Sequence, residues 1–173
     1  VLNAANHGVP QRRERVVFVG FRADLGIEWS FPEATHSLEA LLWEQVRTGD
    51  YWERHEIAKR DRVLDPRFRA RGMALLEKPA DKPWLTVRDA IGDLPDPELQ
   101  PELAAACLNH RFQGGARSYV GHTGSPLDEP AKTLKAGVHG VPGGENMLRR
   151  ADGSVRYFSV RESARLQTCL LYT

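Results

Sequence analysis

The sequence predicts an α+β fold, with a small twisted sheet, short helices and much irregular chain. Three observations support this prediction. An apolar run over 16–21 (VVFVGF) has the composition of a short buried strand. Segment 38–62 has the apolar spacing of helices, and glycines punctuate short strand-like pieces over 114–153. At 173 residues the chain has the length of about one domain.

The predicted strand follows a charged segment, 11–15 (QRRER). Pro10 fixes its own φ angle and favours an extended chain before it. Since alternate residues of an extended segment face the same side, we expect Gln11, Arg13 and Arg15 to point together. An amide and two guanidinium groups suit recognition of phosphate or carbonyl oxygens. A solvated charge run beside a strand is the ordinary alternative.

The helical segment 38–62 places Leu38, Leu41, Leu42 and Val46 on one face. Residues 48–50 (TGD) should interrupt it, because glycine favours a break in a helix. Asp65-Pro66 is expected to end its charged second half.

Two further helices carry start signals of the capping-box kind, in which a hydroxyl residue precedes an acidic residue by three positions. Thr86 and Asp89 form the first, before a small apolar face made by Val87, Ala90, Ile91 and Leu94. Ser159 and Glu162 form the second, which opens the last predicted helix.

Charge is nearly balanced, with 24 Lys+Arg against 23 Asp+Glu, but it is unevenly distributed. Basic residues gather in 11–22 and 132–161, and acidic residues gather in 81–102. Two basic ends around an acidic middle suit a polyanion held by the ends. Ordinary solvated surface explains the same pattern.

Several functional classes are excluded. No run of about 18 apolar residues and no secretory signal is present. Cys107 and Cys169 form no CxxC, which excludes a disulfide scaffold or thiolate zinc site and indicates a reducing compartment. The six histidines are expected to be surface or structural, and Cys107 a small core residue. No GxSxG, HExxH, Walker loop or dinucleotide fingerprint occurs, and the first residue is Val, which indicates a missing N-terminal piece.

Two segments resemble conserved blocks of the DNA cytosine-5 methyltransferases. Residues 3–22 (NAANHGVPQRRERVVFVGFR) resemble the eighth block, and 156–168 (RYFSVRESARLQT) resemble the ninth. Between them, 84–97 (WLTVRDAIGDLPDP) and 126–145 (PLDEPAKTLKAGVHGVPGGE) resemble the variable region of bacterial members. The four segments occur in the family's order and span almost the whole chain.

The resemblance implies a chemistry for the charged segment. In this family a cysteine attacks C6 of a flipped-out cytosine, and C5 then takes a methyl group from S-adenosylmethionine. Arg15 matches the arginine that contacts the flipped base and helps to hold its developing charge. Arg13 matches an arginine that supports the same pocket, and Gln11 matches a position at its entrance.

The resemblance also implies contacts with double-stranded DNA. Thr133 and Leu134 match a Thr-Leu/Val pair that contacts DNA in family members. Arg161 matches the ninth block, which organises the recognition domain, and Glu162 is expected to act first as a helix cap. The expected phosphate contacts beside these segments are basic: Lys132, Lys135, Arg149 and Arg150.

The sequence also departs from the family. It has no Pro-Cys-Gln nucleophile motif, no Glu-Asn-Val block and no glycine-rich cofactor block. S-adenosylmethionine is therefore expected to bind a missing N-terminal portion, and the chain alone is not expected to methylate DNA. After LQT, residues 169–173 (CLLYT) replace the family's Phe-Pro-Asp, which suggests a truncated or out-of-frame end.

These expectations divide the chain into three parts. Residues 1–25 form the C-terminal edge of the catalytic α/β methyltransferase sheet, 26–155 the target recognition domain, and 156–173 the ninth-block helix. Segment 38–71 is a family-specific insertion without an assigned role. The expected partners are duplex DNA and the missing part of the enzyme, in the bacterial cytoplasm at the nucleoid. A stand-alone DNA-binding module and an RNA (tRNA) methyltransferase relative are the alternatives.

Overall fold

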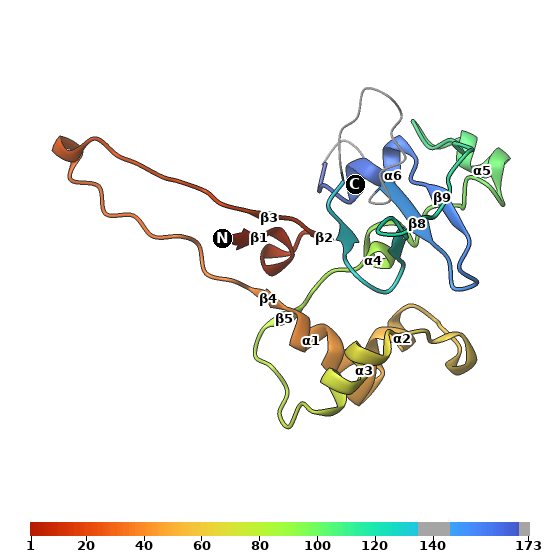
Figure 1. The fold of residues 1–173 in the computed structure, drawn as a ribbon, viewed down its shortest axis with the longest axis horizontal. Helices are drawn as coiled ribbons and strands as arrows, with labels where there is room; N and C mark the ends of the chain where they lie inside the picture. Colours follow the sequence, from red (N-terminus) through yellow and green to blue (C-terminus); the bar gives the residue numbers. More distant parts are fainter. Residues whose placement is uncertain (135–145, 170–173) are drawn as a thin grey trace.

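The computed structural model describes residues 1–134 and 146–169, and its strands form four small sheets (Figure 1). Helices alternate with these sheets, so the chain has the mixed character of an α+β fold. The two antiparallel pairings join β1 (Leu2–Asn3) to β3 (Glu14–Arg15), and β8 (Met147–Arg149) to β9 (Val155–Tyr157). The three parallel pairings join β2 (Gln11–Arg12) to β7 (Ala131–Lys132), β4 (His36–Ser37) to β5 (Lys82–Pro83), and β6 (Ser125–Pro126) to β8.

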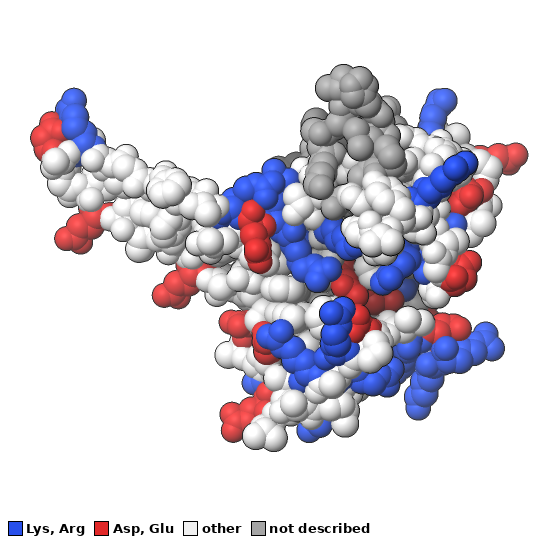
Figure 2. All heavy atoms as spheres, viewed as in Figure 1, with Lys and Arg blue, Asp and Glu red and all other residues white. Residues whose placement is uncertain are grey.

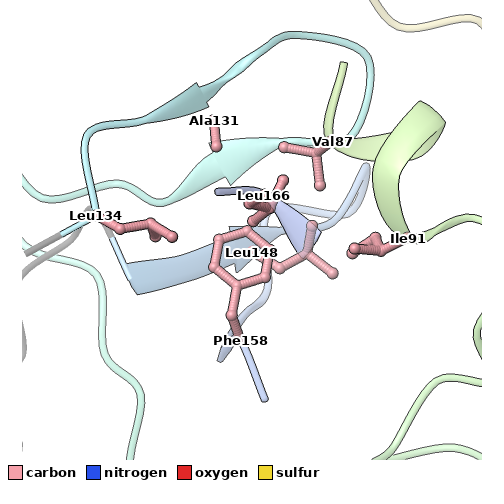
Figure 3. Packing of buried hydrophobic residues seen from close by; sticks show 7 residues of the cluster. All are labelled: Val87, Ile91, Ala131, Leu134, Leu148, Phe158 and Leu166. Carbon is pink, nitrogen blue, oxygen red and sulfur yellow. The ribbon is translucent and has the colours of Figure 1, made fainter. Parts of the chain in front are cut away.

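The main core lies between the β6–β8–β9 sheet and two helices, α4 (Val87–Ile91) and α6 (Val160–Arg165). Figure 3 shows the seven buried apolar side chains that meet there. They come from α4, the β7 region, β8 and the chain around α6: Val87, Ile91, Ala131, Leu134, Leu148, Phe158 and Leu166. Leu134 belongs to this cluster, so the core reaches the predicted Thr-Leu pair.

Both predicted capping boxes are confirmed. Thr86 accepts a hydrogen bond from the Asp89 backbone N–H, and the Asp89 side chain accepts one from the Thr86 N–H. Ser159 and Glu162 make the same reciprocal pair at the start of α6. The short α5 (Pro101–Ala105) lies between these two helices in sequence.

The helical segment predicted over 38–62 is confirmed. It contains α1 (Leu38–Leu42), the π-helix η3 (Trp43–Thr48), α2 (Asp50–Arg54) and the short η4 (Lys59–Asp61). Gly49, at φ 86°, breaks it as expected. Asp65-Pro66 does not end the segment: Asp65 caps α3 (Pro66–Met73) and Pro66 occupies its first turn, the position where a missing N–H costs least. A second core of Leu41, Tyr51 and Trp52 holds these helices together.

The prediction of a buried strand over 16–21 is wrong. Residues 16–35 run out and back as a narrow arm, with η2 (Ala23–Leu25) at its tip (Figure 1). Val16 is 62% and Phe18 92% exposed. An apolar run forms a buried strand only where neighbouring strands and a core cover it, and the described residues supply neither. Aromatic contacts lie within the arm, among them Trp29 against Phe31 at 4.5 Å.

Two other expectations have different outcomes. His110 is fully buried, and its ring nitrogens lie 2.7 Å from Ser159 Oγ and 2.7 Å from the Pro95 carbonyl oxygen, which confirms a structural role. Cys107 is only partly buried, between exposed Leu103 and Leu108, so it is not a core residue. The α5 segment turns just its Ala104 inward, which leaves Cys107 at the surface.

Candidate nucleic-acid interface

The two segments predicted to hold functional residues meet in one parallel strand pair, β2–β7. After η1 (Ala4–His7), Gly8 adopts φ 80° and turns the chain toward β2. Gln11 then lies opposite Ala131, and Arg12 opposite Lys132. The Ala131 N–H donates to the Pro10 carbonyl at 2.9 Å. The ladder therefore joins positions about 120 residues apart in sequence.

Side chains strengthen this strand pair. Thr133 Oγ1 donates a hydrogen bond to the Arg12 carbonyl at 2.8 Å. Arg13 Nη1 reaches the Leu134 carbonyl at 3.5 Å, and Arg12 Nη2 lies 3.2 Å from Glu129 Oε2. We call these residues, with β2 and β7, the β2–β7 junction. It brings Gln11, Arg13, Lys132, Thr133 and Leu134 together.

Gln11 has an unusual environment within the junction. Its side chain is 1% exposed, and neither its Oε1 nor its Nε2 has a hydrogen-bond partner within the described residues. Leaving a buried polar group unsatisfied costs about 1–3 kcal/mol. Any partner of this amide therefore lies outside the described protein atoms.

Arg15 lies outside the junction. The extended segment is interrupted at Arg13, and Arg15 belongs to β3, opposite Leu2 of β1. Its side chain is exposed and donates from Nη1 to the Glu14 carbonyl at 2.6 Å. Gln11 is buried whereas Arg15 faces solvent, so the three polar groups do not converge as strict alternation predicts.

The remaining predicted contacts occupy different places. Lys132 Nζ donates to Thr123 Oγ1 at 3.0 Å, beside the junction. Lys135 lies outside the described residues. Arg161 lies in the first turn of α6, where its N–H donates to the Asn109 carbonyl at 3.0 Å. The structure thus places Arg161 with the α6 packing.

The other two basic residues predicted as phosphate contacts are Arg149 and Arg150, and their surroundings differ from those of Lys132. Arg150 is held by carboxylates, at 3.1 Å from Asp96 and 2.6 Å from Glu98. Arg149 ends β8 and is partly buried. The acidic partners of Arg150 satisfy its charge, which makes it a structural residue more than a phosphate contact.

Sequence reasoning missed a buried polar network behind the junction, centred on Asp128. Arg88 donates to its two carboxylate oxygens at 2.6 and 3.1 Å, and the Tyr51 hydroxyl donates to Oδ1 at 2.9 Å. Gln45 Nε2 donates to the Asp128 carbonyl at 2.7 Å. Burial and the charge of Asp128 raise the pKa of Tyr51, which keeps its hydroxyl a donor. No local sequence pattern marked this network, because Tyr51 and Asp128 lie 77 positions apart in the chain.

The network connects the helical segment to the junction. Gln45 and Tyr51 belong to η3 and α2, and the next residue after Asp128 is Glu129, the partner of Arg12. Burial raises the pKa of Glu129, and the charge of Arg12 opposes that rise. Segment 38–73 is therefore fixed onto the chain that carries β7.

The described residues show no metal centre and no cofactor cradle. They contain no group of three or more His, Cys, Asp and Glu side chains that could hold a metal ion. Among them no strand enters a helix through a glycine-rich turn, the arrangement that suits many nucleotide cofactors. None of the described helices is long and apolar enough to cross a membrane.

Comparison with known proteins gives a consistent result. The family model of the C-5 cytosine-specific DNA methylases matches residues 1–169. The chain is similar to the Type II methyltransferase M.MthTI of Methanothermobacter thermautotrophicus, with 28% identity over 96% of the chain and 43% of that protein. It is also similar to M.BsuRI of Bacillus subtilis, at 27% identity over 97% of the chain and 30% of that protein.

A third relative, M.AquIA of a Picosynechococcus species, is 38% identical over 69% of the chain and 35% of its own length. The chain thus spans less than half the length of each of these curated relatives. No solved structure matches the chain.

Proposed function

The chain belongs to the family of C-5 cytosine-specific DNA methylases, and from this membership we propose its role in the reaction. It supplies target recognition and the base-pocket arginines of a DNA cytosine-5 methyltransferase. That enzyme transfers a methyl group from S-adenosylmethionine to C5 of a flipped cytosine in a specific duplex sequence. The nucleophilic cysteine and the cofactor site belong to a further portion of the enzyme, so the chain alone is inactive.

The β2–β7 junction is the observation that supports this proposal. A pocket for a flipped base needs groups that bind the base and groups that hold the DNA backbone, both in fixed geometry. In this proposal Arg13 supports the base pocket, Gln11 lies at its entrance, and the Thr133–Leu134 pair contacts the DNA. The hydrogen bond from Thr133 to Arg12 ties the two sets into one element. Residues 1–25 then join the catalytic domain, 26–155 recognise the target and 156–173 pin the recognition domain.

The proposed chemistry places positive charge at the base. Attack at C6 makes the ring an anionic adduct, and a guanidinium that donates to O2 stabilises it. Arg15 is exposed and bonded to no carboxylate within the described residues, so its guanidinium can turn to a base. Lys132, Lys135 and Arg161 are proposed phosphate contacts, which hold the register of the duplex without reading its sequence.

The test uses the complete methyltransferase, obtained from the reading frame that surrounds this chain. Arg15→Ala should lower the methyl-transfer rate by about 10²–10³-fold, the usual cost of losing one oxyanion donor. Its dissociation constant for the target duplex should change far less. Methyl transfer is measured with labelled S-adenosylmethionine, and binding by fluorescence anisotropy.

Arg22→Ala is the matched control, because Arg22 is an exposed arm residue paired with Asp24 at 2.5 Å. It should leave both quantities unchanged. Equal losses of binding and turnover in Arg15→Ala would show that Arg15 holds DNA and not the reacting base. A preference for tRNA over duplex DNA in competition would replace the DNA substrate with RNA.

A further inference from the structure

The helical segment contains a cationic cavity that the proposed pocket does not use. The cavity has a volume of about 430 Å³ and lies among η3, η4 and α3. Three basic side chains line it: Lys59, Arg62 and Arg69. The other lining residues are apolar or neutral, and no carboxylate is among them: Gln45, Val46, Trp52, Leu64 and Met73.

The three cations differ from most other basic residues of this segment, although Arg47 also lacks an ion pair in the described part of the chain and instead donates to the Met73 carbonyl. Arg54, Arg67 and Arg71 pair with Glu44, Asp65 and Glu39. Within the described residues, Lys59, Arg62 and Arg69 form no ion pair. Arg62 Nε donates to the Ile57 carbonyl at 3.2 Å, which fixes its guanidinium at the cavity wall.

Converging like charges repel one another, so this arrangement favours an anionic ligand. Trp52 and Met73 contribute apolar surface to the same cavity. Lys59 and Arg69 are exposed, so both side chains can reach a ligand at the opening. The cavity offers separate positive charges and no set of donors and acceptors that matches the edge of a base. Such an arrangement suits a backbone phosphate.

A hydrogen bond and an ion pair connect the cavity to the β2–β7 junction. Gln45 lines the cavity and donates to the Asp128 carbonyl, and the adjacent Glu129 pairs with Arg12. A second cavity of about 300 Å³ shares Leu64 and extends to Glu129 and Arg149. In Figure 2, Lys and Arg side chains lie beside β2 and β3 and over the helical segment, with Asp and Glu side chains among them.

We propose that Lys59, Arg62 and Arg69 bind a backbone phosphate of duplex DNA outside the target sequence. This inference rests on the proposed function. The helical segment then makes a second contact with the duplex. Gln45 and Tyr51 hold this segment at a fixed position relative to the junction. It adds affinity and register without reading bases.

The test measures DNA affinity of the complete methyltransferase against salt concentration, for the wild type and for Lys59→Ala/Arg62→Ala/Arg69→Ala. Each lost phosphate contact lowers the slope of log K against log salt by about 0.9. Between 50 and 200 mM salt, the variant should therefore lose about 3- to 4-fold less affinity per lost contact. Methylation of the same target sequence should persist.

A control variant of equal charge is Arg60→Ala/Arg67→Ala/Arg71→Ala, whose guanidiniums pair with Asp61, Asp65 and Glu39. It should keep the wild-type slope. The same loss of slope in both variants would assign the effect to net charge and overturn the cavity site. An unchanged slope in the first variant would also overturn it, and lost methylation in cells would then indicate an acidic protein partner.

Duplex length provides an independent readout. Flanking base pairs added to the target sequence should raise the affinity of the wild type and leave that of the triple variant unchanged. If the triple variant fails to fold, Lys59→Gln/Arg69→Gln replaces it, because both side chains are exposed. A wild type that neither binds nor methylates duplex DNA refutes the proposed function itself. A wild type that does both, with no contribution from the cavity residues, refutes this inference alone.

Discussion

Glu162→Gln should destabilise the fold strongly, because it removes the charge from a buried ion pair. Arg156 donates to both Glu162 carboxylate oxygens at 2.7 Å, and the two side chains are 3% and 2% exposed. Glu162 also accepts the Ser159 N–H at 2.8 Å. Breaking a buried pair from one side costs about 3–5 kcal/mol. Asp96, at 3.3 Å from Arg156, retains part of the compensation, which favours the lower end, about 3 kcal/mol.

Urea denaturation of the chain, followed by tryptophan fluorescence, measures this loss. Glu98→Gln is the control, since its pair with Arg150 is more exposed and contributes about 1 kcal/mol at most. The double variant Arg156→Met/Glu162→Leu should regain much of the loss, because apolar side chains can replace a buried pair. A loss below about 1 kcal/mol for Glu162→Gln would refute the argument that Arg156 depends on this carboxylate.

Two other perturbations test the packing and the acid sensitivity. Gly72→Ala should cost about 1–3 kcal/mol in urea denaturation, because a Cβ would lie 2.7 Å from Val46 Cγ2; a neutral result would contradict the close contact of α3 with η3. Burial alone would raise the pKa of Asp96, but a backbone N–H and two arginines outweigh it and lower this pKa. A lowered carboxyl pKa stabilises the fold above the unfolded value of about 3.9, so the unfolding free energy should fall as the pH drops below about 4. Asp96→Asn should flatten that fall in urea titrations from pH 6 to 3, and an unchanged pH profile would refute the assignment.

Local signals were the most predictable part of the fold. The capping boxes at Thr86 and Ser159 depend on residues three positions apart, so the sequence contains the whole motif. The helical segment also follows from local periodicity. The exposed conformation of 16–21, at the start of the arm, does not follow from local periodicity. Its apolar residues become a buried strand only if other strands cover them. The composition of 16–21 indicates that these side chains need to be covered. It does not indicate whether a neighbouring strand is present to cover them.

The membership of the candidate site stays a prediction, and its geometry did not follow from the sequence. The family resemblance selected Gln11, Arg13, Thr133 and Leu134, and the structure brings these four together. It could not show that Gln11 is buried without a partner or that Arg15 lies outside the junction. The Asp128 network was missed because Tyr51 and Asp128 are 77 positions apart, and no periodic pattern connects them.

The position of Asp128 and Glu129 gives the helical segment a physical connection to the site. Asp128 receives hydrogen bonds from Tyr51 and Gln45, which belong to the helices, and Glu129 holds Arg12, which belongs to β2. A rotation of the helices would have to move the Asp128 carbonyl, and with it the chain that enters β7. Because β7 is paired to β2, that motion would also reach Gln11 and Arg13. A phosphate bound at Lys59, Arg62 and Arg69 would therefore hold Gln11 and Arg13 in place as well as the duplex.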